Sequence, residues 1–402
     1  MGIQSLFDIF EYNEHELYLV GGAVRDLLLG EIPHDYDFAT DALPEEIETW
    51  FEHTSTIGSR FGTVGVIINK KMYEITTYRK DSEYVDGRHP EAVAFTWNFK
   101  EDVKRRDFTI NGLLMDRHGA IFDCVGGIED LEKGIVRCIG DPFKRFEEDK
   151  LRKWRGIRLA TEKGMILEEK TQAAIQSDPD LTGVSIERIQ EEFKRIIMAE
   201  KVDFGGAVLI KTGLLTSLLQ NIFSEEKPEY REGLSAAFES MTYLPKNFPM
   251  RLGALLLKLK SQDRLFFLKA MKFSKKEGQM AMKYCQYYKV DAQKDIMAFK
   301  KALATFGLEE AKKLINFQEG LSQYDQQQIA AHVQKNKAVL KRIILEKEPL
   351  TMKDLAINGT DLQTLGLIGE AIKKALEDTL DYVYCYPENN DRQVLLKRLE
   401  SR

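Results

Sequence analysis

Cysteine and proline are scarce in this chain, whose 402 residues include four cysteines and ten prolines. The cysteines form no Cys-x-x-Cys pair, which argues against a structural zinc site and a disulfide framework. They are Cys124, Cys138, Cys285 and Cys385. No run of 18 apolar residues occurs, and the first twenty residues lack the pattern of a secretory signal. We therefore expect a reduced, cytoplasmic protein that makes no membrane contact.

Positive charge is in deficit, with 58 Lys and Arg against 64 Asp and Glu and a formal net charge of −6. This balance counts against nucleic-acid binding over the whole surface, although it permits a local basic face. Residues 251–283 offer such a face, because they hold nine Lys or Arg against only Asp263 and Glu277. A solvated helix surface and an RNA-binding face explain this run equally well.

The hydrophobic pattern changes near Pro142. Before it, short apolar runs predict strands, and two intervening patterns, 22–29 and 43–52, predict helices. The predicted strands cover 17–20, 35–39, 63–68, 72–78 and 120–124, and a hairpin at 69–71 joins the third to the fourth. Beyond Pro142, amphipathic helical patterns dominate and no proline occurs between Pro249 and Pro349. The sequence thus predicts an α/β region followed by helices only.

Residues 18–40 combine two features of phosphate chemistry. An apolar run ends at Gly21-Gly22 and passes directly into a helical pattern, so backbone N–H groups at the helix start can face an anion. Asp35 and Asp37 follow on the next predicted strand, where residues two apart share a face and can bind one hard cation. Each feature alone is usually turn chemistry. Together they suggest nucleotidyl transfer.

Three further motifs follow along the chain. They are Arg-Arg-Asp-Phe-Thr-Ile-Asn at 105–111, Asp-Cys-Val-Gly-Gly-Ile-Glu-Asp at 123–130, and Glu-Asp-x-x-Arg at 148–152 with Arg155 and Arg158 beyond it. On spacing alone, the last of these is better explained as an ion pair on a helix surface. The segment at 185–192 begins with Ser185, a natural helix N-cap, and Asn358-Gly359-Thr360-Asp361 precedes Gly366 and Gly369.

Taken in this order, the motifs resemble those of the class II tRNA nucleotidyltransferases, the CCA-adding enzymes and bacterial poly(A) polymerases of the polymerase-β superfamily. The resemblance runs from about residue 16 to the C-terminal end. It implies an α+β fold with a polymerase-β-like nucleotidyltransferase head followed by an all-helical neck, body and tail. We expect a catalytic head over 1–138, a neck for base recognition over 139–200, and tRNA-binding body and tail over 201–290 and 291–402.

The resemblance also implies site residues. Asp35 and Asp37 are the expected catalytic carboxylates and would hold Mg²⁺, whereas Glu74 is left out of this metal set. The expected residues for binding ATP or CTP are Gly22, Arg25, Arg106, Asp149, Arg152, Arg155 and Arg158. If 145–158 is one ideal helix, Arg158 lies nearly opposite Asp149 and about 13.5 Å along the axis. It would then serve the triphosphate or brace the head.

The implied function is template-independent addition of CCA to the 3′ end of tRNA from CTP and ATP, with release of pyrophosphate. Asp86-Gly87-Arg88-His89-Pro90 resembles a loop that CC-adding members lack. Poly(A) polymerases usually carry a long basic C-terminal extension, which is not expected here. CC-adding and A-adding enzymes stay open, and a catalytically inactive RNA-binding protein is a distant alternative. The oligomeric state is also open, a homodimer included.

Overall fold

The computed structural model describes residues 2–55, 61–81, 93–225, 227–324 and 330–401. The predicted loop at 86–90 lies outside these residues. The chain divides into two compact units, Met1–Arg231 with Ala270–Lys272, and Glu232–Lys269 with Phe273–Arg402. The predicted division into head, neck, body and tail stays a prediction.

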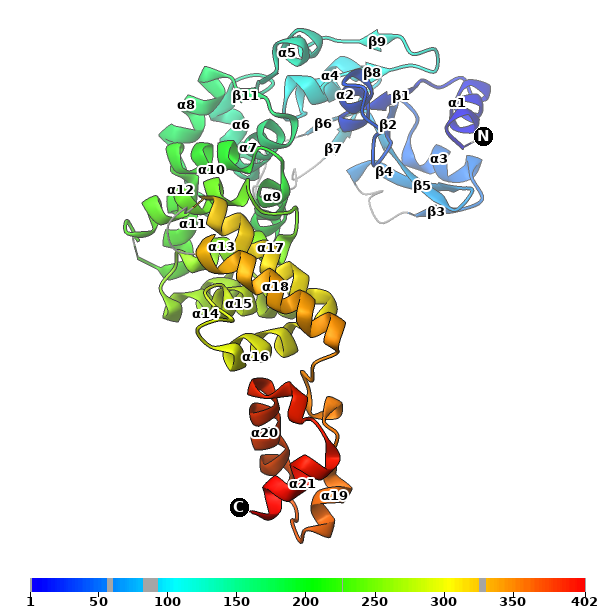
Figure 1. Cartoon of the computed structure of the whole chain (residues 1–402). Helices are drawn as coiled ribbons and strands as arrows, with labels where there is room; N and C mark the ends of the chain where they lie inside the picture. The colour runs from blue at the N-terminus through cyan, green and yellow to red at the C-terminus, as the bar shows by residue number, and fades with distance from the viewer. Residues whose placement is uncertain (1, 56–60, 82–92, 226, 325–329, 402) are drawn as a thin grey trace. The chain divides into compact units, whose positions relative to one another are not determined.

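A seven-stranded sheet organises the first unit, in the order β3-β4-β5-β2-β1-β8-β9 (Figure 1). Its strands are β1 (Leu17–Val20), β2 (Asp37–Thr40), β3 (Thr54–Ser55), β4 (Thr63–Ile68), β5 (Lys71–Thr77), β8 (Leu114–Met115) and β9 (Ile121–Phe122). Only the β2–β5 pair is parallel, and the other neighbours are antiparallel. Two smaller sheets pair β6 (Arg79–Asp81) with β7 (Val93–Phe95) and β10 (Ile135–Val136) with β11 (Ile166–Leu167).

Apolar side chains cover both faces of the large sheet. On one face, α1 (Gly2–Tyr12) and α3 (Pro44–Trp50) contribute Phe10 and Ile47 to a buried cluster with Phe38 and Ile75. On the other face, α4 (Phe99–Lys104) packs Val103 in a second cluster. The two faces carry different buried side chains, and this fixes the register of the strands, because a shift of one residue would move every core side chain into the opposite cluster.

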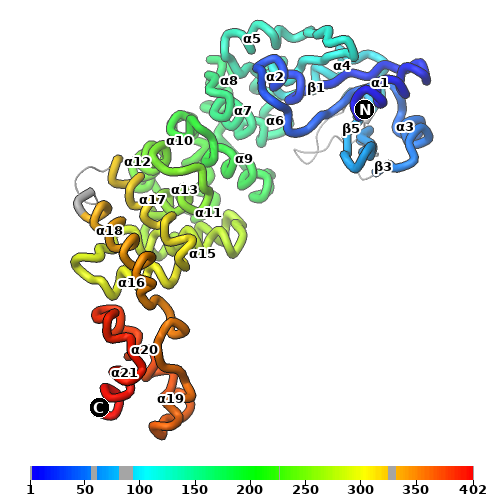
Figure 2. Tube along the Cα trace, turned by 45° about the vertical axis from the view of Figure 1, so that its right-hand side comes forward, coloured from blue at the N-terminus to red at the C-terminus, as the bar shows by residue number. Residues whose placement is uncertain are grey.

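The remaining helices of the first unit connect or follow this sheet. They are α2 (Gly22–Leu28), η2 (Thr109–Asn111), α5 (Gly127–Lys133), α6 (Pro142–Glu148), α7 (Leu151–Lys163), α8 (Glu169–Ser177), α9 (Ile186–Met198), α10 (Val202–Lys211) and α11 (Leu214–Phe223). Helix α7 packs against α9 and α10, which follow it in the Cα trace (Figure 2). Trp154 of α7 is fully buried beside Phe193 of α9.

The second unit contains helices only within its described residues. They are α12 (Tyr230–Met241), which starts in the first unit, α13 (Phe248–Leu257), α14 (Ser261–Ala270), α15 (Lys275–Tyr287), α16 (Ile296–Phe306), α17 (Leu308–Tyr324), α18 (Ala330–Glu346), η3 (Met352–Asp354), α19 (Gly359–Thr364), α20 (Glu370–Cys385), η4 (Pro387–Asn389) and α21 (Arg392–Glu400). A separate apolar cluster joins α19, α20 and α21 through residues such as Leu362, Val383 and Leu395. The α+β prediction is confirmed.

The structure bears on three local predictions, which concern the hairpin, the N-cap at Ser185 and the glycines of the tail segment. The hairpin forms through Asn69 and Lys70, both with positive φ. Ser185 occupies the N-cap position of α9, but its side chain makes no capping hydrogen bond. In the tail segment, Gly366 follows α19 and Gly369 precedes α20, both with positive φ, as expected for glycines at helix ends.

Among the described residues, no single helix has the length and apolar composition needed to cross a membrane. Helices α10 and α11 meet these criteria of length and composition only when they are taken as a pair, and the chain bends by 75° between them.

Candidate active site

The predicted carboxylates and the Gly-Gly turn meet at one edge of the large sheet. Val20, the last residue of β1, lies opposite Asp37, the first residue of β2. Asp37 in turn lies beside Glu74 of the parallel strand β5. The prediction that Asp35 lies on this strand is wrong, because β2 begins only at Asp37 and Asp35 precedes it without strand pairing. The same-face argument therefore does not apply, and Asp35 reaches the site from the connecting segment.

Negative charge accumulates at this edge. The pKa of the Asp37 carboxyl is raised, first because neighbouring protein atoms displace water and then because Glu74 and Asp35 add negative charge, while Arg106 acts in the opposite direction. A hard cation relieves such repulsion, and oxygen donors suit it. No group of three or more Asp, Glu, His or Cys side chains within the described ranges is placed to hold a metal ion. Asp35 and Asp37 stay the predicted ligands, and Glu74 beside Asp37 stays an open third carboxylate.

Two arginines lie against the Gly-Gly turn. Gly21 adopts φ 69° and ψ −133°, a conformation that favours glycine. A Cβ on Gly21 would lie 3.5 Å from a terminal guanidinium nitrogen of Arg106, and one on Gly22 would lie 3.4 Å from a terminal nitrogen of Arg25. The structure therefore brings together the predicted residues Gly22, Arg25 and Arg106, which come from two separate motifs.

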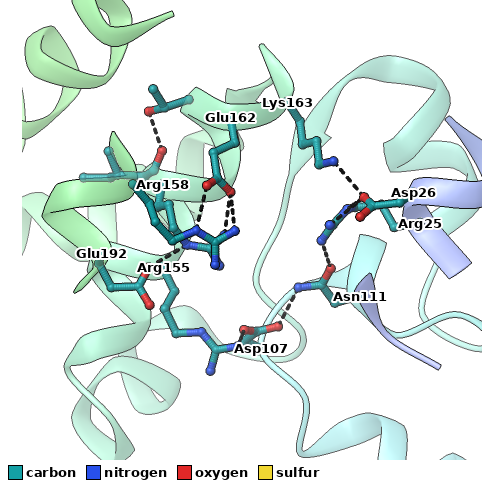
Figure 3. A network of polar contacts seen from close by, with 12 residues as sticks. Arg25, Asp26, Asp107, Asn111, Arg155, Arg158, Glu162, Lys163 and Glu192 are labelled. Atoms are coloured by element: carbon teal, nitrogen blue, oxygen red, sulfur yellow. Dashed lines mark hydrogen bonds and ion pairs between the residues drawn. The ribbon is translucent and has the colours of Figure 1, made fainter. Parts of the chain in front are cut away.

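Arg25 is held by two neighbours. Its Nε and one terminal nitrogen donate to Asp26 Oδ1 at 2.9 and 2.6 Å, and the other terminal nitrogen donates to Asn111 Oδ1 at 2.6 Å (Figure 3). Asn111 also donates to Asp107 at 3.1 Å. These contacts fix the plane of a guanidinium that is itself mostly buried.

Arg106 is oriented by a buried carboxylate. Asp102 is 1% exposed and accepts hydrogen bonds from both Arg105, at 2.8 Å, and Arg106, at 3.0 Å. Burial alone would raise the pKa of Asp102, but the charges of Arg106 and Arg105 outweigh it, so the pKa is lowered. Asp102 therefore stays ionised at neutral pH and holds both guanidinium groups.

The helix expected over 145–158 is interrupted, which corrects the prediction of one continuous helix. Helix α6 ends at Glu148 and α7 begins at Leu151, and Asp149 between them has extended backbone angles. The Asp149 carboxylate accepts from the Leu151 N–H at 3.0 Å and from Arg188 of α9 at 3.1 Å. These two contacts hold Asp149 at the break, so its direction does not follow ideal helix geometry.

Arg152 points back toward the second motif. It donates to Glu148 at 2.8 Å and to the carbonyl oxygen of Arg145 at 2.9 Å, and a weaker contact reaches the carbonyl oxygen of Arg105 at 3.4 Å. Arg145 itself donates to the carbonyl oxygens of Arg105 and Arg106. Arg152 is thus brought close to the backbone that carries Arg106.

Arg155 and Arg158 have separate environments on α7. Arg155 pairs with Asp107 at 2.7 Å and remains 39% exposed. Arg158 is buried between Glu162 at 2.6 Å and Glu192 of α9 at 2.5 Å. Of the two roles expected for Arg158, the two carboxylates favour bracing, here of α7 against α9. The structure does not bring Arg158 to the Gly-Gly turn through any contact among the described residues.

Sequence reasoning assigned no role to Asp102, Asn111 or Arg188. A signal existed for Asp102, which lies three and four residues before Arg105 and Arg106, the spacing of helical ion pairs. Asn111 lies within a recognised motif. No sequence signal links Arg188 with Asp149, because that contact depends on how α9 packs against α7.

Comparison with known proteins identifies the family. Residues 17–137 match the model of the poly A polymerase head domain, and residues 164–225 match the "Probable RNA and SrmB- binding site of polymerase A". A CCA-adding enzyme of Geobacillus sp. (strain WCH70) is 35% identical over 362 residues, which cover 89% of this chain and 85% of that one. The chain belongs to the CCA-adding enzyme family. The predicted resemblance is confirmed.

A solved structure agrees over the full length. The CCA-adding enzyme of Bacillus stearothermophilus in complex with CTP matches with a TM-score of 0.82 and 30% identity, covering 99% of this chain and 97% of that chain. The CCA-adding enzyme of Lactobacillus helveticus (strain DPC 4571) is 40% identical over 264 residues. That alignment spans 64% of the relative, just under two thirds of its length.

Proposed function

We propose that this protein adds C, C and A in turn to the 3′ end of tRNA, using CTP and ATP and releasing pyrophosphate. The main support is the sheet edge, where Asp37 lies opposite Val20 and near the charge of Asp35. Arg25 and Arg106 lie against the Gly-Gly turn at the same edge. Membership of the CCA-adding family and the CTP bound in the Bacillus stearothermophilus relative support the same reaction.

The chemistry follows from this edge. CCA-adding enzymes are nucleotidyltransferases that generally use divalent metal ions. Asp35 and Asp37 would hold the cation, Mg²⁺ in our proposal, which supplies charge neutralisation at the α-phosphate and activation of the RNA 3′-hydroxyl. Arg25 and Arg106 would bind oxygens of the triphosphate or sugar through paired N–H donors. These contacts align the nucleotide so that the hydroxyl attacks opposite the pyrophosphate leaving group.

Asp149 and Arg152 would read the incoming base. Cytosine and adenine both present an exocyclic amine donor beside a ring-nitrogen acceptor, whereas uracil and guanine present a carbonyl acceptor beside a ring N–H. A carboxylate next to a guanidinium complements the first pattern and opposes the second. Arg155 would contribute a further cation to the triphosphate through its remaining N–H donors while it stays paired with Asp107. We assign Arg158 to bracing and give it a lesser role in nucleotide binding.

Part of the basic run is suited to tRNA. Lys275 and Lys276 occupy the first turn of α15, where the helix dipole disfavours cations, so a phosphate group nearby would stabilise them. Arg251 is 3% exposed and belongs to the protein interior. Lys272 pairs with Glu187. Of these four residues, we therefore assign the RNA contact to Lys275 and Lys276. We further propose that the reaction takes place in the cytoplasm, and homodimer formation stays a prediction that light scattering can measure.

Pyrophosphate release tests this proposal directly. Wild-type protein, given tRNA without its CCA end, should release pyrophosphate with CTP and should release more when ATP is added. Asp37→Ala should release none and still bind tRNA with nearly unchanged affinity. If the wild-type protein releases no pyrophosphate with both nucleotides, the RNA-binding alternative is favoured. Pyrophosphate release by Asp37→Ala at a near-normal rate would overturn the carboxylate assignment.

A further inference from the structure

Helix α7 contacts the environment of Arg25 at two separate points (Figure 3). At the first, Arg155 pairs with Asp107 at 2.7 Å, Asn111 donates to Asp107 at 3.1 Å, and Arg25 donates to Asn111 at 2.6 Å. At the second, Lys163 pairs with Asp26 Oδ1 at 2.7 Å, the same oxygen that Arg25 engages. Both routes therefore end on one guanidinium.

The spacing of the two contacts restrains the helix. Arg155 and Lys163 are eight positions apart on α7, which corresponds to about 12 Å along its axis. Packing against α9 and α10 already holds α7, and two polar contacts this far apart add a restraint on its tilt and sliding relative to Arg25. Since α7 begins beside Asp149 and carries Arg152, the restraint also acts on the predicted base-reading pair.

The hydrogen-bond capacity of Arg25 leaves donors for a ligand. A guanidinium has five N–H donors, and the contacts to Asp26 and Asn111 occupy one on each of its three nitrogens. Among the described residues, one donor on each terminal nitrogen has no partner, and both nitrogens lie within 3.7 Å of the Cβ position of Gly22. The two nitrogens that carry these remaining N–H groups thus both lie at the Gly-Gly turn.

The second contact is shielded from solvent. The side chains of Lys163 and Asp26 are 10% and 14% exposed. Burial alone would raise the pKa of Asp26, but the hydrogen bond from Lys163 and the charge of Arg25 outweigh it and lower the pKa. Lys163 also pairs with Glu31 at 2.5 Å, so it keeps one carboxylate when Asp26 is neutralised.

We propose that Lys163, Asp26 and Asn111 are positioning residues that fix Arg25 relative to α7. They set the spacing between the site that binds phosphates and the site that reads the base. A nucleotide therefore binds tightly only when its triphosphate and its base are both in place. This inference rests on the proposed function, because it takes the triphosphate to be the ligand of Arg25.

Lys163→Met tests the proposal, since it removes the charge and keeps an unbranched side chain. We expect the KM for CTP and the inhibition constant of pyrophosphate both to rise about tenfold, with kcat changed much less, because a ground-state phosphate contact is misplaced. Lys163→Arg should restore most of the loss. Asp26→Asn should cost at least as much as Lys163→Met, because Asp26 also accepts directly from Arg25. The double variant should be no worse than Asp26→Asn alone, because Lys163 acts on Arg25 through Asp26.

Lys133→Met is the matched control, because Lys133 pairs with Glu129 at the exposed surface of the same unit. It should leave both constants unchanged. Pyrophosphate binding by calorimetry needs no turnover, so it separates this inference from the proposed function. A wild-type protein that adds no nucleotide would refute the function. An unchanged pyrophosphate affinity in Lys163→Met, or a loss confined to thermal stability, would overturn the positioning role.

Discussion

Base selection by Asp149 and Arg152 yields the most specific prediction. Both side chains are about nine-tenths buried, at 10% and 7% exposed, so an unpaired hydrogen-bonding group there cannot turn to water. Leaving one such group unsatisfied costs roughly 1–3 kcal/mol, or about 5- to 160-fold in relative rate. A variant that lacks Asp149 or Arg152 no longer imposes that residue's share of the free-energy penalty on UTP and GTP. We expect Asp149→Ala and Arg152→Ala each to reduce discrimination against UTP and GTP at least about tenfold.

The structure sharpens this experiment. Asp149→Asn keeps an acceptor for the Leu151 N–H but offers the base a donor as well, so it should relax discrimination with less loss of stability. Arg188→Ala removes the group that holds Asp149 and should weaken discrimination partially. Arg195→Ala is the matched control, because Arg195 lies on the same helix, pairs with Glu162 and is 57% exposed.

Single-nucleotide incorporation kinetics decide the outcome. The ratio of kcat/KM for CTP to that for UTP should fall in the four site variants and stay constant in Arg195→Ala. Metal dependence should survive in all of them. If Asp149→Ala and Arg152→Ala lose rate equally with all four nucleotides, the pair does not read the base, and the pairing of these residues with Arg188 and Glu148 is merely structural.

Three other predictions follow from the charges. Asp37→Asn should abolish nucleotide addition yet raise the melting temperature at pH 7, because the raised pKa of Asp37 means that its ionised form opposes folding. The gain in melting temperature should vanish at acidic pH, where the wild-type carboxyl is also neutral. A lower melting temperature of the variant at pH 7 would contradict this prediction. Asp102→Asn should lower the free energy of unfolding by about 3 kcal/mol, because it strands two partly buried arginines. Since the pKa of Asp102 is lowered, its stabilisation is present above the unfolded pKa and is lost as the pH falls, so denaturant curves of wild type and variant should converge in acid. Replacing Lys275 and Lys276 by Gln should flatten the slope of log tRNA affinity against log salt by up to about 2, whereas Lys272→Gln should change it less; an unchanged slope would identify the run as a solvated surface.

Local patterns were sufficient for much of the fold. Leu17–Val20 and Thr63–Ile68 form strands with the predicted bounds, because apolar runs there are bounded by turn residues. The helices between Pro249 and Pro349 were likewise predictable from their periodicity. In these segments, local preference and tertiary packing favour the same conformation.

The break at Asp149 was not predictable in this way. Glu148, Asp149 and Lys150 are all compatible with a helix, and the extended backbone of Asp149 depends on Arg188, which follows far along the chain. The contact of Lys163 with Asp26 likewise joins residues from distant segments. Motif spacing identified candidate residues, but which carboxylate holds which arginine depends on three-dimensional packing.

Extension of tRNA with each nucleotide supplied singly tests the central claim most directly. Three substrates are needed, ending at the discriminator base, after the first C, and after CC. We predict that CTP extends only the first two, that ATP extends only the third by a single A, and that UTP and GTP extend none. Repeated addition of A, extension that stops at CC when ATP is present, or no addition by the wild-type protein would contradict the account.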